Sequence, residues 1–107
     1  MNKLATAAVA FVTLASCGYP KSGPAPGPLQ PQAATTAEQR WPGTTTEQLE
    51  HGRTIFIAKC NGCHDYPDLH AIAEDRWPAV LQKMSIKAKL STDESTMVLH
   101  FILAARQ

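Results

Sequence analysis

The stretch Cys60-Asn61-Gly62-Cys63-His64 decides what kind of domain this 107-residue chain forms. Its spacing, CxxCH, is the pattern of a covalent c-type haem attachment site. Residues three apart on a helical turn share a face, so the Cys60 and Cys63 thiols are placed to bond two vinyl groups of one porphyrin. The imidazole of His64 follows directly and is placed to bind the iron as proximal ligand. The motif therefore predicts one covalently bound haem c.

A bare CxxC also occurs in thiol–disulfide enzymes and in zinc sites, and both remain alternatives. The first needs a strand–helix–strand frame, and the sequence before Cys60 has no clear run of β-branched residues. The second needs further ligands, and a second cysteine pair is lacking. Only the scattered histidines His51, His70 and His100 remain as partners. Haem attachment is the favoured interpretation.

The N-terminus has the features of a secretory signal. Lys3 supplies a positive charge, and the mostly apolar residues 4–15 follow it. This run is too short to cross a bilayer as a helix, which needs roughly 20 residues. Leu14-Ala15-Ser16-Cys17 resembles the bacterial lipobox, in which the cysteine becomes the lipid-modified first residue of the mature chain.

We therefore expect residues 1–16 to be a lipoprotein signal peptide and Cys17 to carry a lipid anchor. The alternative is an ordinary signal cut near Gly18, which would discard Cys17. Lipidation accounts for all three cysteines, one for lipid and two for haem. It implies a protein held on the inner or outer membrane of a bacterium and facing the periplasm. Bacterial c-type haem is attached in this compartment.

Composition divides the mature chain at about residue 44. Residues 18–44 contain six of the eight prolines, with Ala, Gln, Thr and Gly between them. Such a segment buries too little apolar surface to offset its chain entropy, so residues 17–44 are predicted to be a lipidated, disordered tether. Trp41 is expected to pack against the edge of the domain downstream.

Residues 45–107 form the predicted folded domain. Seven Lys or Arg residues face eight Asp or Glu residues, and no basic run is present, so nucleic acid is not an expected partner. A domain of about 60 residues has a small hydrophobic core and usually needs an additional stabilising group or cross-link. A bound porphyrin would supply an apolar face for the chain to pack against.

The pattern of this domain is helical throughout. A capping box from Thr44 to Glu47 opens the first predicted helix, which runs into the CxxCH motif. A second helix is expected near Asp75, as its cap, with Pro78 in the first turn. A third begins at the capping box from Ser91 to Glu94. The apolar or small residues at helical spacing are Leu49, Gly52, Ile55, Phe56 and Cys60 in the first helix, Trp77, Val80, Leu81 and Met84 in the second, and Met97, Val98, Phe101 and Ile102 in the third.

Over residues 46–105 the chain resembles a small single-haem class I cytochrome c. In that family a helix with a small residue and an aromatic leads into CxxCH, as Gly52 and Phe56 do here. A C-terminal helix with an aromatic, matched by Phe101, crosses it near the small residue. The resemblance implies an all-α, minimal cytochrome c fold of about three helices wrapped on one haem. The long loop of the family is absent, since 26 residues separate His64 from Ser91.

The resemblance therefore does not assign the sixth iron ligand, for which Met84, Met97 and His70 are the candidates. In the family the ligating Met lies a dozen or more residues before the C-terminal aromatic. Met84 precedes Phe101 by 17 residues, whereas Met97 precedes Phe101 by only four. Met84 shares a helix face with Trp77, so it is the preferred ligand; the alternative is a flexible core filler.

Together these features predict an electron carrier, not an enzyme. The expected protein is a periplasmic, membrane-tethered monohaem cytochrome with His64 and Met84 on the iron, and its partners are redox proteins of a respiratory or periplasmic chain. The sequence shows no catalytic triad, paired acid–base carboxylates or phosphate loop. Alternatives are a five-coordinate haem that binds a gas or peroxide, the haem subunit of a larger redox complex, and a structural zinc knuckle.

Overall fold

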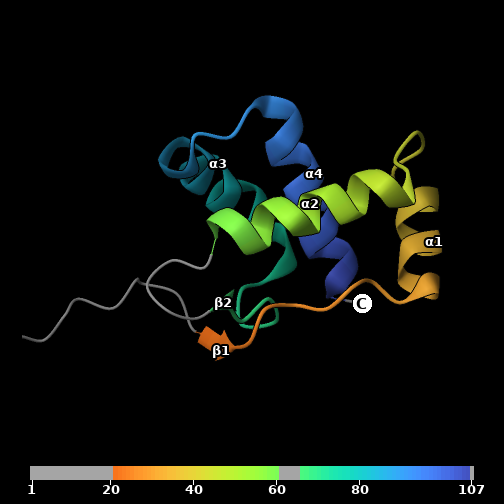
Figure 1. The fold of residues 1–107 in the computed structure, drawn as a ribbon, viewed down its shortest axis with the longest axis horizontal. Helices are drawn as coiled ribbons and strands as arrows, with labels where there is room; N and C mark the ends of the chain where they lie inside the picture. Colours follow the sequence, from red (N-terminus) through yellow and green to blue (C-terminus); the bar gives the residue numbers. More distant parts are fainter. Residues whose placement is uncertain (1–20, 61–65, 107) are drawn as a thin grey trace, which may run out of the picture.

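The computed structural model describes residues 21–60 and 66–106, and the fold in this part of the chain is all-α (Figure 1). A short 3-10 helix, η1 (Glu74–Arg76), leads into α3, and two short strands, β1 (Lys21–Gly23) and β2 (Tyr66–Pro67), pair antiparallel. The α-helices are α1 (Pro31–Arg40), α2 (Thr46–Lys59), α3 (Trp77–Ala88) and α4 (Thr92–Ala105). The all-α prediction is confirmed, with four helices in the described residues in place of about three.

The crossing of α2 and α4 is the most extensive contact between helices in the described fold. Gly52 is buried there, and a Cβ on it would overlap the backbone carbonyl of Met97 on α4. Beside the crossing, the rings of Phe56 and Phe101 lie 5.9 Å apart between centroids. The predicted crossing of the last helix near the small residue is confirmed, and only glycine fits at this position.

The start of α2 differs by one residue from the predicted capping box. The Thr45 side chain, not that of Thr44, accepts a hydrogen bond from the Gln48 backbone amide, and Gln48 replaces Glu47 as the reciprocal partner. The side chains of glutamine and glutamate both accept through an oxygen. A capping box could therefore start at Thr44, with Glu47, or at Thr45, with Gln48.

The starts of α3 and α4 show one correction and one confirmation. Ser91 and Glu94 form the predicted capping box of α4. Asp75 was wrongly expected to cap α3, because it lies inside η1, and the N-cap residue of α3 is Arg76, without a side-chain cap. Pro78 does lie in the first turn, where its missing amide hydrogen costs nothing.

The structure differs from the predicted disorder of residues 17–44 where a helix forms within this segment. Residues 31–40 form α1, which packs on α4. Ala34 and Ala37 are buried with Leu49 and Ala104 in a second small core. The average composition of the segment concealed this helix, because small alanines three apart give a narrow apolar stripe that allows close helix packing.

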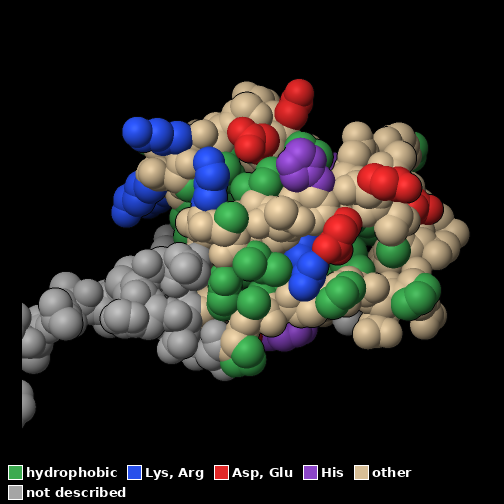
Figure 2. Space-filling model, viewed as in Figure 1, with side chains coloured by type: hydrophobic (Ala, Val, Ile, Leu, Met, Phe, Trp, Pro, Cys, Tyr) green, Lys and Arg blue, Asp and Glu red, His purple; other side chains and the backbone are tan. Residues whose placement is uncertain are grey.

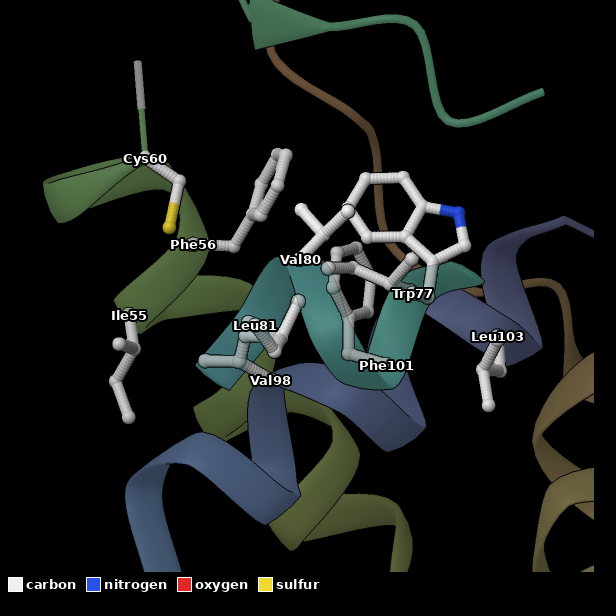
Figure 3. Close-up of a cluster of buried hydrophobic side chains, with 10 residues drawn as sticks. Ile55, Phe56, Cys60, Trp77, Val80, Leu81, Val98, Phe101 and Leu103 are labelled. Atoms are coloured by element: carbon white, nitrogen blue, oxygen red, sulfur yellow. The ribbon is translucent and has the colours of Figure 1, made fainter. Parts of the chain in front are cut away.

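The main core lies between α2, α3 and α4 (Figure 3). Its buried members are Ile55, Phe56, Cys60, Trp77, Val80, Leu81, Val98, Phe101, Ile102 and Leu103. The predicted apolar faces are confirmed, with two qualifications: Met84 is partly buried at the edge of this core, and Met97 is partly buried outside it.

Substituting Gly52 tests the helix crossing. Alanine normally favours a helix over glycine by about 1 kcal/mol. At this position we expect Gly52→Ala to lower the free energy of unfolding by about 1–3 kcal/mol, because the new methyl group must push α4 away. Urea unfolding followed by far-UV circular dichroism measures the change.

Gly27→Ala is the matched control, because a Cβ at Gly27 meets nothing within 4 Å. We expect this variant to unfold like the unmodified protein. A Gly52→Ala protein as stable as the unmodified one would contradict the close crossing.

Candidate functional site

Cys60 places the start of the motif at the C-terminal end of α2. It is the C-cap residue, its amide donates to the Phe56 carbonyl at 2.9 Å, and its side chain is buried in the main core. Figure 3 shows the Cys60 sulfur at the α2 end of this cluster. Residues 61–65, with the predicted Cys63 and His64, and the predicted lipidation site Cys17 lie outside the described residues.

The surroundings of Cys60 do not suit a nucleophilic thiol. Burial raises the pKa of the Cys60 thiol to about 11, so it is neutral at pH 7. Reactive cysteines of CxxC redox enzymes have lowered pKa values, typically at a helix N-terminus, whereas Cys60 follows a helix C-terminus. This arrangement does not suit thiol–disulfide exchange at Cys60.

The three candidates for the sixth ligand lie in different places. Met84 packs against the same core cluster that contains Cys60. Met97 lies at the α2–α4 crossing, outside the cluster that contains Cys60, and lines a groove of about 500 Å³ with His100. His70 is exposed and lines a groove of about 490 Å³ beside β2. Met84 therefore packs on the cluster that contains Cys60, and Met97 does not.

The end of α3 lies beside the end of α2 and is strongly basic. The Lys59 ammonium donates to the Ala88 carbonyl at 3.5 Å, which links the two helix ends. Lys83, Lys87 and Lys89 are exposed around the end of α3. In Figure 2 basic side chains gather at this end of the molecule, whereas acidic side chains lie mainly along the top and the opposite end.

Two hydrogen bonds from side chains to backbone carbonyls hold β2 and the segment that follows it. The Tyr66 hydroxyl donates to the Ile57 carbonyl at 2.9 Å, and the indole of Trp77 donates to the Leu69 carbonyl at 3.3 Å. Trp77 is thus a core residue with a satisfied N–H, as its position on the apolar face indicated. These bonds fix the chain that returns from the motif to the body of the domain.

Arg106 is a structural residue that the sequence analysis missed. Its guanidinium donates to the carbonyls of Leu69 and Ile72, and its Nε is buried without a hydrogen-bond partner among the described residues. An arginine after the last turn of a helix carries no local pattern that would predict this contact across 34 or more residues.

Trp41 and His100 dock the end of α1 onto α4. Their rings stack with centroids 4.2 Å apart and an interplanar angle of 12°, so Trp41 packs at the domain edge as predicted. The Arg40 guanidinium lies over Trp41 and pairs with Glu74 at 2.5 Å. The Thr44 hydroxyl lies 3.4 Å from His100 Nδ1.

Within residues 21–60 and 66–106, three or more His, Cys, Asp or Glu side chains nowhere group closely enough to hold a metal ion. In the same part of the chain no helix has both the length and the apolar character to span a membrane. The chain matches no protein-family model, no curated protein and no solved structure.

Removing the Arg106 guanidinium tests its role. In Arg106→Met the Leu69 and Ile72 carbonyls lose a charged donor, so we expect the free energy of unfolding to fall by about 2–3 kcal/mol. Amide hydrogen exchange should also accelerate over residues 69–72. The control is Arg76→Met, since Arg76 is exposed; equal stability of the two variants would contradict the proposed role.

His100 makes the stability depend on pH. Burial first, and then the charge of Arg40, lower the pKa of His100 from its usual 6.5. The unfolded chain therefore takes up this proton at a higher pH than the folded one, and the stabilising contribution, complete above about pH 6.5, is lost as the pH falls through the lower folded value.

We expect the melting temperature to fall as the pH is lowered from about 7.5 to about 5.5. The fall should be smaller in His100→Phe, which retains an aromatic ring against Trp41. Thermal unfolding at a series of pH values measures both slopes. Identical slopes in the two proteins would show that His100 does not carry this dependence.

Proposed function

We propose that the protein is a lipid-anchored electron carrier of the bacterial periplasm with one covalent haem c. Cys60 and Cys63 would form the thioethers, His64 the proximal iron bond and Met84 the distal one. The observation that carries this proposal is the position of Cys60, buried at a helix end in the same apolar cluster as Met84. Cys17 would carry the lipid.

The described residues suit a porphyrin at this place. Val80 and Leu81 on α3 and Phe56 on α2 belong to the same apolar cluster as Cys60, and such surroundings would exclude water from a ring bound to the Cys60 sulfur. Tyr66 and Trp77 hold the returning chain by hydrogen bonds to backbone carbonyls. The fold thus provides a rigid frame on both sides of the motif.

The bound haem would supply reversible one-electron chemistry, taking one electron from a donor protein as ferric iron becomes ferrous and passing it to an acceptor protein. As a soft ligand, the thioether of Met84 would favour the ferrous state and would give a higher reduction potential than a second histidine. Contacts with such redox partners are small and transient.

An absorption spectrum of the purified protein tests the haem. We expect a Soret band, a mass increase of one haem that survives unfolding, and loss of covalent attachment when Cys60 and Cys63 are both changed to alanine. A protein without a Soret band would contradict the proposal and leave the zinc and thiol interpretations.

The distal ligand is tested separately. In the ferric protein we expect a far-red Met–iron charge-transfer band that disappears in Met84→Ala. Met97→Ala and His70→Ala are matched controls and should retain it. Persistence of the band in Met84→Ala would overturn this assignment, and rapid carbon monoxide binding by the unmodified ferrous protein would favour the gas-binding alternative.

A further inference from the structure

The segment between the proposed lipid site and α2 is attached to the domain at successive points. β1 pairs with β2 in the register Lys21 to Pro67 and Gly23 to Tyr66. Arg53 on α2 donates to the Pro26 carbonyl at 3.0 Å, and Leu29 packs against both cores. With α1 on α4 as well, the described residues leave little of this segment free to act as a tether.

The chain between Cys17 and β1, called the leash below, is therefore short. Cys17 and Lys21 are four residues apart, and an extended chain covers at most about 3.6 Å per residue, so the anchor lies within about 14 Å of β1. A free tether of 27 residues would have had an r.m.s. reach of about 29 Å. β1 pairs with β2, and the Tyr66 hydroxyl on β2 donates to the Ile57 carbonyl of α2, so β1 lies at the same end of the molecule as Cys60 (Figure 1).

The side chains around the end of α3 suit a lipid surface. Ile86 is 78% exposed and is flanked by the exposed Lys83 and Lys87. Lys89 has a left-handed backbone (φ 56°), a conformation for which glycine is the usual residue at a helix end. A lysine in this position adds a third charge, and an apolar side chain among lysines is typical of groups that contact anionic headgroups.

From these observations we propose that the end of the domain that carries Cys60 rests on an anionic lipid surface. The short leash from Cys17 holds it there, and Ile86 with the three lysines contacts the headgroups. This inference rests on the lipid anchor and haem of the proposed function. It replaces a freely swinging carrier by one that exchanges electrons at the membrane surface.

Energy transfer to the haem measures its distance from the membrane. The lipidated haem protein is placed in phosphatidylcholine vesicles, with and without phosphatidylglycerol, that contain a headgroup-labelled fluorescent lipid. We expect strong quenching that falls several-fold when a 20-residue Gly/Ser linker is inserted after Pro20, because the leash grows from at most about 14 Å to an r.m.s. reach of about 27 Å.

The same linker added after Gln107 is the matched control and should leave quenching unchanged. If residues 18–44 were a free tether, the insertion after Pro20 would change the reach only from about 29 to about 38 Å, and a correspondingly small loss of quenching would overturn the proposal.

The lysine surface is tested by changing Lys83, Lys87 and Lys89 together to glutamine. We expect the variant with the long leash to quench more strongly in vesicles with phosphatidylglycerol than without it, and the glutamine changes to remove this difference. Equal quenching in both lipids, or an unchanged difference in the glutamine variant, would overturn the headgroup contact. If the glutamine variant keeps the difference between the two lipids but transfers electrons more slowly to a redox partner protein, the lysines would be assigned to protein docking.

A measurement that needs neither lipid nor haem separates this inference from the proposed function. In Cys17→Ala we expect slow amide hydrogen exchange over residues 31–40, as in a docked helix. Exchange at the rate of an unfolded chain would overturn the short leash and leave the haem assignment standing. A missing Soret band with slow exchange would instead overturn the haem assignment alone.

Discussion

The contact between Gly52 and the backbone of Met97 is the constraint on which the rest of the described fold depends. Because no side chain separates the two helices at this point, α2 and α4 approach closely and their aromatic residues meet beside the crossing. The direction of α2 then determines where it ends. Cys60 is consequently buried in the main core, and the motif starts from a rigid support.

The last helix is surrounded on several sides. α2 and α3 cover one part of α4, while α1 covers another through Ala104 and the stacked His100. This explains why Leu103 and Ala104 are buried although they lie outside the predicted apolar face. An amphipathic helix has one apolar stripe, and a helix that is apolar over more of its circumference requires a second neighbour.

The helices with strong periodicity could be predicted from the sequence, because Leu49, Ile55 and Phe56 repeat at helical spacing and Ser91 with Glu94 marks a helix start. α1 could not, because alanine is a weak apolar signal and proline dominates the composition of its surroundings. The apolar Leu103 and Ala104 were the available signal for a further packing partner.

Within the candidate site, the burial of Cys60 and its neighbourhood with Met84 agree with the apolar faces that the sequence predicted. The contact of Arg106 with the Leu69 and Ile72 carbonyls was not predictable. Backbone carbonyls are present at every residue, so the sequence does not indicate which of them a distant arginine binds.

The packing of α1 on α4 also has a consequence for the order in which the chain folds. The residues of α1 are synthesised near the start of the described chain, and their partners Ala104 and His100 are synthesised at its end. Contacts between such distant parts of a sequence form late, because a long loop must close first. The N-terminal segment therefore packs onto the domain only after α2 and the motif have been synthesised. The contacts of α1 with α4 need the residues of α4, which are synthesised last.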